Sequence, residues 1–253
     1  MLETRKKKII AKASAVLLAL LLWQLLSILV GSDILLVSPI GVVKRLFTLV
    51  LEAEFLSTVG FTLSRIAVGF LLGLIAGTLL ALLAGRFEIV EILLWPYMIT
   101  VKSVPVASFV VVALIWFSAS GLSALISFLM VLPIIYTNLL DGIKSVDKKM
   151  LEMADVFKMP HLRRLRFIWL PSVKPFLLSG CRISLGLAWK SGVAAELIGY
   201  PEGSVGEALY YSKLFLNTAD LFAWTVVIVL LSIIFEKLFL FILKRILKGV
   251  ESI

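Results

Sequence analysis

The 253-residue sequence contains one cysteine, Cys181, and one histidine, His161. A single cysteine cannot build a disulfide framework, and no His, Cys, Asp and Glu residues show the spacing of a metal site. There is no Ser–His–acid arrangement to support nucleophilic catalysis. No glycine is followed by lysine, so the GxxxxGK[ST] loop that cradles phosphates in ATPases is absent. The sequence therefore predicts that this chain is not an enzyme and holds no cofactor of its own.

Charged residues are also scarce. They form 16% of the chain, whereas hydrophobic residues form 61%, and an ordinary soluble domain has about 25% charged residues. One soluble core cannot bury this much apolar surface, which excludes a soluble enzyme and a disordered chain. We expect the chain to lie largely in the lipid bilayer. The net charge of +9 then concerns orientation in the membrane, and we expect no nucleic-acid partner.

Long apolar runs dominate what remains. A membrane-spanning helix needs about 20 mostly apolar residues, and six stretches qualify. These are residues 13–30, 59–84, 92–117, 122–140, 173–199 and 221–243. We expect the third stretch to be broken at Pro96 and Pro105, because proline removes a backbone donor. The predicted fold class is an all-α membrane protein with six transmembrane helices.

The positions of lysine and arginine predict the orientation. With the N-terminus in the cytoplasm, 17 of the 25 basic residues fall in cytoplasmic segments, three fall outside and five fall within spans. Basic residues concentrate on the cytoplasmic side of membrane proteins. We therefore expect both termini to be cytoplasmic.

The chain divides into three parts. Residues 1–54 form the first span and an external amphipathic segment, residues 55–243 form the core transmembrane domain, and residues 244–253 form a cytoplasmic tail. Two segments outside the spans, 39–54 and 204–217, have apolar residues at helical spacing. We expect both to form helices at the membrane surface.

The longest cytoplasmic loop, residues 143–171, has an ordered pattern. Apolar residues at 150–157 suit a short amphipathic helix, Met159–Pro160 interrupts it, and a second helix restarts at His161. An exposed apolar face flanked by charge is typical of a docking surface. The pattern alone equally allows a helix held on anionic lipid by its basic cluster.

In the same loop, Glu152-Met153-Ala154 is followed, after the turn, by Ile168-Trp169-Leu170-Pro171. This pattern resembles the EAA loop of permeases of ATP-binding-cassette importers. The resemblance covers roughly residues 55–243 and is strongest to the nitrate, sulfonate and taurine branch of the type I family. Further matching residues are Thr62-Leu63-Ser64-Arg65, Gly69-Phe70, Gly73, Gly77, Trp116-Phe117, Gly121, Pro133, Asn138, Gly180, Ala188-Trp189 and Ala194-Ala195-Glu196.

Two departures stand in the loop. Met153 replaces the middle alanine, and Lys158 replaces the usual glycine, so we expect Met159–Pro160 to make the turn instead. The resemblance implies that the short helix docks in a groove of a cytoplasmic ATPase subunit. The residues that it assigns to this coupling are Glu152, Met153, Ala154, Asp155, Phe157 and Lys158.

Charges within spans mark a candidate translocation pathway, because charges in a bilayer are costly. Lys102 lies between two prolines, and Arg182 and Lys190 lie roughly on one side of a helix. Two interpretations stay open, either structural pairing with Glu196 on a neighbouring helix or subunit, or a cationic cavity for an anionic substrate. The candidate pathway residues are Lys102, Arg182, Trp189, Lys190 and Glu196.

The resemblance implies an ATP-driven importer in the bacterial inner membrane. Its other parts would be two ATPase subunits that hold ATP and Mg²⁺, a second permease copy, giving a homodimer, and an extracytoplasmic substrate-binding protein. A sulfonate, taurine, nitrate or bicarbonate is the expected substrate class. A small heterocycle such as a thiamine or riboflavin precursor is the alternative, and a stand-alone secondary transporter is a further one.

Overall fold

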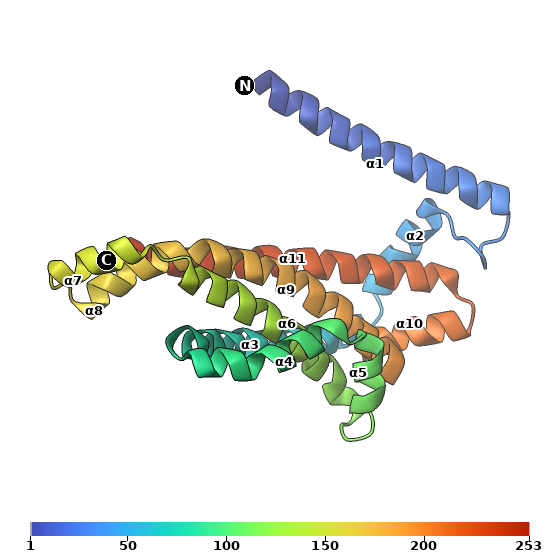
Figure 1. Ribbon diagram of the computed structural model, residues 1–253. Coiled ribbons are helices and arrows are strands. Elements are labelled where there is room, and N and C mark those ends of the chain that lie inside the picture. The colour runs from blue at the N-terminus through green and yellow to red at the C-terminus, as the bar shows by residue number, and fades with distance from the viewer. Residues whose placement is uncertain (1, 253) are drawn as a thin grey trace. The chain divides into compact units, whose positions relative to one another are not determined.

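The computed structural model describes residues 2–252, and within them every regular element is a helix (Figure 1). The α-helices are α1 (Leu2–Val30), α2 (Pro39–Val50), α3 (Phe55–Arg86), α4 (Glu88–Ser103), α5 (Val106–Ala113), α6 (Ala119–Lys144), α7 (Lys148–Val156), α8 (His161–Arg164), α9 (Leu170–Gly199), α10 (Val205–Leu214) and α11 (Thr218–Ser252), and a π-helix, η1, covers Leu165–Trp169. They form two compact units. One comprises the residues up to Thr58 with Ala208–Ile228, and the other comprises Val59–Glu207 with Val229–Ile253.

The first unit contains the predicted external segment 39–54 as the helix α2. Ser38 caps this helix by accepting a hydrogen bond from the backbone N–H of Gly41. Pro39 occupies the first turn, where a backbone N–H would have no acceptor within the helix, so the missing N–H of proline costs no hydrogen bond. The end of α1 is tied to the chain before α2. The indole N–H of Trp23 donates to the carbonyl oxygen of Val37 at 3.1 Å, and the hydroxyl of Ser27 donates to that of Leu36 at 3.0 Å.

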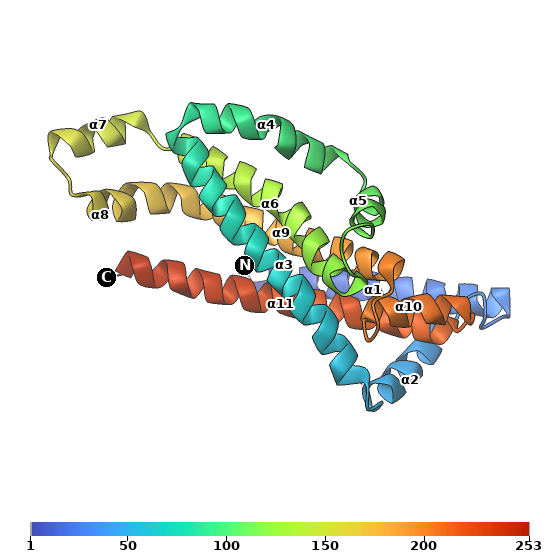
Figure 2. The ribbon, with the colours of Figure 1, turned by 90° about the horizontal axis from the view of Figure 1, so that it is seen from below.

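The second unit is built around α6 and α9, which lie side by side (Figure 2). The hydroxyl of Ser127 on α6 donates to the carbonyl oxygen of Ala188 on α9 at 3.1 Å. The small residues of α3 face α6. A Cβ atom on Gly69 would come within 2.2 Å of the carbonyl oxygen of Ala124, so only glycine allows this approach of the two backbones.

The third apolar stretch is broken at one of the two expected prolines, Pro105. It forms two helices, α4 and α5, bent by 100° at a break after Ser103. Val104 is extended before Pro105, as proline disfavours helix in the residue that precedes it. The expected break at Pro96 is wrong, because α4 continues through this residue. One missing donor removes only one helical hydrogen bond, which a helix of 16 residues tolerates.

Helices cover the six predicted stretches except for residues 104–105 and 114–117 of the third. Four of the described helices are long and apolar enough to cross a membrane, and the bent pair α4–α5 makes a fifth if it counts as one span. The helix α9 has 30 residues, and it carries Lys174, Arg182, Lys190 and Glu196. The chain is thus an all-α membrane protein, and the count of six spans and the cytoplasmic placement of the termini remain predictions.

Candidate coupling loop and translocation face

The loop between α6 and α9 folds as a helical hairpin at the end of these two helices (Figure 2). Asp147 begins α7, because its carboxylate accepts a hydrogen bond from the backbone N–H of Lys149 at 2.9 Å. After α7 the chain turns and returns through α8 and η1 directly into α9. The predicted helix–turn–helix is present. Its second arm is continuous with α9.

The turn itself corrects the sequence expectation. Lys158 adopts a positive φ of 47°, the left-handed conformation that glycine adopts most easily. The backbone N–H of Met159 then donates to the carbonyl oxygen of Ala154 at 2.8 Å, which closes the end of α7. Met159–Pro160 follows the reversal and does not replace it. Lys158 thus takes the backbone conformation that a glycine would have taken.

A small apolar core holds the hairpin together. Val146, Ala154 and Ile168 are buried, with Ala154 only 1% exposed, and the partly buried Leu151, Met159 and Trp169 pack around them. An ion pair at the surface also joins the two arms, because the guanidinium of Arg164 donates to the exposed carboxylate of Asp155 at 2.6 Å. The two arms of the loop are therefore fixed relative to each other.

The outer face of α7 is left uncovered. Glu152 is exposed, and so are Met153, Val156 and Phe157, the last with 76% of its surface accessible. Two of the six predicted coupling residues have their side chains engaged within the hairpin. Ala154 points into the hairpin core, and Asp155 is paired with Arg164. The side chain of Ala154 is thus unavailable to a partner and serves to position the exposed ones.

The π-helix η1 is a feature that the sequence analysis missed. A π-helix carries one more residue per turn than an α-helix and is common at functional sites. It places Ile168 in the hairpin core, while Leu165 stays 59% exposed. No residue type in this segment signals it, since Leu165–Trp169 would suit an ordinary α-helix equally well.

The predicted pathway residues on α9 separate into two faces. Arg182 and Lys190 are exposed, together with Ile183 and Leu197, so they share one uncovered face of the helix. The nearest acidic partner of Arg182 is Glu236, with the two side chains 3.9 Å apart.

The opposite face of α9 points into the second unit. Trp189 is buried, 2% exposed, and its ring meets the edge of Phe235 at a centroid distance of 6.1 Å. Its indole N–H has no acceptor among the described residues. Trp189 is therefore out of reach of a solute in this conformation.

Glu196 is fully buried and joins three segments of the second unit. Its carboxylate accepts a hydrogen bond from the hydroxyl of Thr62 at 2.8 Å, and the backbone N–H of Gly206 lies 3.4 Å from the same oxygen. The hydroxyl of Thr62 in turn accepts from the backbone N–H of Val205 at 3.0 Å. Among the described residues, Glu196 thus bonds to Thr62 and Gly206 and not to Arg182 or Lys190, so the structural pairing weighed from the sequence does not occur within the chain.

Lys102 lies at the end of α4, just before the bend. Its ammonium donates to the hydroxyl of Thr137 on α6 at 3.3 Å, and the side chain is exposed. The structure does not bring Lys102 into contact with Arg182 or Lys190. Each of the three cations is nevertheless accessible.

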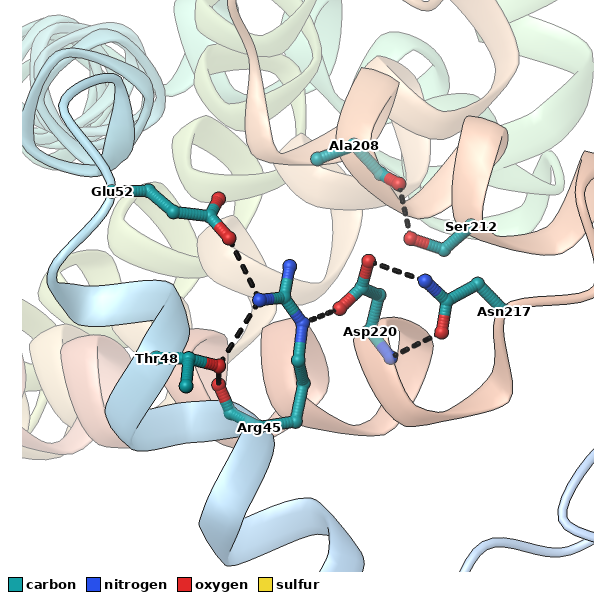
Figure 3. Close-up of polar contacts among 7 residues, drawn as sticks. All are labelled: Arg45, Thr48, Glu52, Ala208, Ser212, Asn217 and Asp220. Carbon is teal, nitrogen blue, oxygen red and sulfur yellow. Dashed lines mark hydrogen bonds and ion pairs between the residues drawn. The ribbon is translucent and has the colours of Figure 1, made fainter.

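A polar cluster in the first unit was not predicted (Figure 3). The guanidinium of Arg45 on α2 donates to Asp220 at the start of α11, to Glu52 at 2.7 Å and to Thr48 at 3.1 Å. Asn217 donates to the other oxygen of Asp220 at 2.7 Å. The hydrogen bond to Asp220 is the main cause that raises the pKa of Arg45 above its ordinary value. Arg45 and Asp220 are 175 residues apart, so no sequence pattern links them.

Comparison with known proteins now identifies the architecture. The family model for the inner membrane component of binding-protein-dependent transport systems matches residues 69–251. The chain belongs to this family, and it is the permease subunit of an ATP-binding-cassette importer in the inner membrane. In this family the ATPase activity resides in a partner subunit.

Individual relatives agree with this assignment. The chain is 30% identical over 241 residues to SsuC of Bacillus subtilis, named as an aliphatic sulfonates transport permease protein, and the match covers 94% of this chain and 86% of the relative. It is 30% identical over 190 residues to the formylaminopyrimidine transport permease protein ThiX of Halalkalibacterium halodurans, covering 74% and 75%. It is 28% identical over 198 residues to the nitrate import permease protein NrtB of Synechococcus elongatus, covering 74% and 70%.

Proposed function

We propose that this permease imports a small anion and that the outer face of α7 is its contact with the ATPase. The observation that carries the coupling proposal is the contrast within one nine-residue helix. Ala154 is buried in the hairpin core, while Phe157 at its end is 76% exposed. An apolar side chain held out by a rigid support is typical of a docking anchor.

The transmission of movement follows from the same hairpin. The core of Val146, Ala154 and Ile168 and the pair Asp155–Arg164 fix α7 to the arm that runs into α9. A displacement of α7 by the ATPase pair would therefore shift α9. Because α9 also carries Arg182 and Lys190, the same shift would move the candidate pathway.

The coupling proposal is tested with charge changes on the exposed face. We expect Phe157→Asp and Glu152→Lys each to reduce co-purification of the ATPase subunit at least tenfold, since a loss of about 1.4 kcal/mol in binding gives that factor. Phe215→Asp is the matched control, because Phe215 is 74% exposed and lies on the side predicted to be external. Equal ATPase yield from all four proteins, wild type included, would contradict the docking role of α7.

The substrate class rests on two lines of support. Sulfonate and nitrate permeases are among the relatives, and the accessible ionisable groups proposed for the pathway, Lys102, Arg182 and Lys190, are all cationic. An anion crossing a low-dielectric environment is stabilised by such groups. Trp189 and Glu196 then act from within the second unit, where they hold α9 in place.

Lys190→Gln provides the test of this pathway. We expect uptake of an aliphatic sulfonate or nitrate by the reconstituted complex to fall at least fivefold, because the positive charge that faces the anion is lost while the size of the side chain is nearly kept. Lys213→Gln, an exposed lysine in the other unit, should leave uptake unchanged. Normal uptake by the Lys190 variant would assign this residue a structural role.

A heterocycle remains the second candidate because the chain also resembles the formylaminopyrimidine permease ThiX. The distinction is made with the companion substrate-binding protein. If that protein is stabilised against heat by a thiamine precursor and not by sulfonates, taurine, nitrate or bicarbonate, the heterocycle reading replaces the anion reading. The coupling proposal is unaffected by this outcome. We further propose two such permease copies per transporter, as a homodimer, with two ATPase subunits and one binding protein.

A further inference from the structure

An apolar pocket of about 560 Å³ opens in the second unit, beside the coupling hairpin. One wall is the cytoplasmic end of α3, from Leu74 to Arg86, and the other is η1 with the start of α9. The remaining lining residues come from α6 and α11 and are Leu139, Ile143 and Leu243. Every wall therefore belongs to a span predicted to end at the cytoplasmic face, or to η1, which leads into one.

The polar groups of this pocket are few and lie in particular places. Thr78 donates its hydroxyl to the carbonyl oxygen of Leu74 at 2.6 Å, so this side chain needs no further partner. Trp169 contributes an indole ring, which prefers the level of the lipid headgroups. Arg86 is the last residue of α3, it is exposed, and no described residue forms a hydrogen bond or ion pair with it.

Hydrocarbon suits this pocket better than water does. A cavity walled by leucine, isoleucine and valine gives water too few hydrogen-bonding partners to fill it. Because the spans that form the walls are predicted to end at the cytoplasmic face, we expect the surrounding solvent to be the acyl chains of the cytoplasmic leaflet. Arg86 adds a cation to the pocket lining, and a lipid phosphate could accept hydrogen bonds from it.

We propose that this pocket binds an anionic phospholipid, with one acyl chain between α3 and η1 and the phosphate paired with Arg86. Basic pockets between helices on the cytoplasmic side are suited to anionic headgroups. The proposal does not depend on the coupling role of α7 or on the substrate. The bound acyl chain would contact η1 through Leu165 and Trp169, which line the pocket, while Ile168 of the same element packs in the hairpin core.

The experiment measures which lipid the purified transporter retains. The intact complex is extracted in mild detergent, equilibrated with equal amounts of phosphatidylglycerol and phosphatidylcholine, and examined by native mass spectrometry. We expect a phosphatidylglycerol adduct on the permease. Arg86→Gln should lower the preference for this lipid about fivefold, the effect of one basic residue near an anionic surface. Lys12→Gln, which removes another exposed cation predicted to be cytoplasmic, is the matched control and should change nothing.

A second variant tests the acyl-chain site separately from the charge. Thr78→Phe fills the pocket and should reduce retention of both lipids, whereas Leu72→Phe on an exposed position of α3 outside the pocket should not. Unchanged size-exclusion profiles and ATPase yields show that these variants still assemble. Equal retention of the two lipids by the wild type, or full retention by Thr78→Phe, would overturn the proposal.

A photo-crosslinker in place of Leu82 identifies the occupant directly. This residue lines the pocket and is 55% exposed. Labelling of phospholipid supports the proposal. Labelling of a second permease copy or of the ATPase subunit would show a protein interface at this place and would overturn it.

Discussion

Two ion pairs in this chain join short helices to longer ones, and their surroundings differ. Arg45 joins α2 to α11 in a closed network in which Thr48, Glu52 and Asp220 accept its hydrogen bonds. Arg164 joins α8 to α7 through Asp155 alone. The first network satisfies its own charges. The second leaves Phe157 and Glu152 on the adjacent face exposed and without a partner in the described part of the chain.

This difference indicates two kinds of helix connection. A network whose charged groups pair with one another fixes a helix in place and leaves no unpaired charge for another protein to bind. The hairpin is held rigid by its apolar core, whereas the side chains on its outer face, such as Phe157, have no packing partner in the described part of the chain. In the proposed coupling role, force applied at Phe157 would reach α9 through this rigid hairpin.

The largest effect is expected from breaking the inside of the hairpin. Ala154→Lys places a charge in the core with Val146 and Ile168, at a cost of about 3–5 kcal/mol for an unpaired buried charge. The hairpin should then lose its fixed geometry. We expect transport and ATPase co-purification to fall to background while the chain still inserts in the membrane, measured by uptake and by quantitative immunoblotting.

Met153→Lys is the control for this variant, because Met153 adjoins Ala154 and is 49% exposed. It should leave the hairpin folded, as judged by resistance to limited proteolysis. If Ala154→Lys resists limited proteolysis as well as Met153→Lys does, the core does not hold the hairpin.

A smaller effect is expected from opening the closed network. Asp220→Asn leaves Arg45 with weaker partners, and the loss of a hydrogen bond between charged groups costs about 1.5–3 kcal/mol. We expect lower thermal stability of the purified chain with normal ATPase co-purification. The loss of stability in the double variant Arg45→Met with Asp220→Asn should be smaller than the sum of the losses in the two single variants. Additive losses would show that the two side chains do not stabilise the protein together.

The smallest effect is expected at the turn. Lys158→Gly relieves the cost of a left-handed non-glycine residue, about 1–2 kcal/mol, and part of this gain is offset by the greater freedom of glycine in the unfolded chain. We expect slower proteolysis within the loop by a factor of a few. Lys149→Gly, within helical backbone, should act in the opposite direction. Faster cleavage of Lys158→Gly would contradict the turn geometry.

The sequence predicted what depends on short-range patterns. Apolar runs predicted the long helices, and apolar residues at helical spacing predicted helices in segment 39–54 and at 150–157. The capping residues Ser38 of α2 and Asp147 of α7 were seen only in the structure. The family assignment from the EAA-like loop is confirmed by the match of the family model. The turn was predicted at Met159–Pro160, but the chain reverses one residue earlier, at Lys158, which has a positive φ. The prediction missed this because lysine rarely adopts the left-handed conformation.

Long-range contacts could not be predicted in this way. Thr62 and Glu196 are 134 residues apart, and neither residue type implies the other. The 100° bend between α4 and α5 is also not a local property, since Pro96 and Pro105 are the same residue type and only the second ends a helix. A single sequence shows where a helix can break, and the packing of the folded chain decides whether it does.

The most direct measurement is crosslinking from the end of α7 in the assembled transporter. A photo-crosslinker replaces Val156, which is 78% exposed, and another replaces the control Phe215. We expect position 156 to label the ATPase subunit with a yield that changes when ATP is bound, and position 215 not to label this subunit. If position 156 labels only lipid while the ATPase is present in the complex, this face of α7 does not couple ATP hydrolysis to transport.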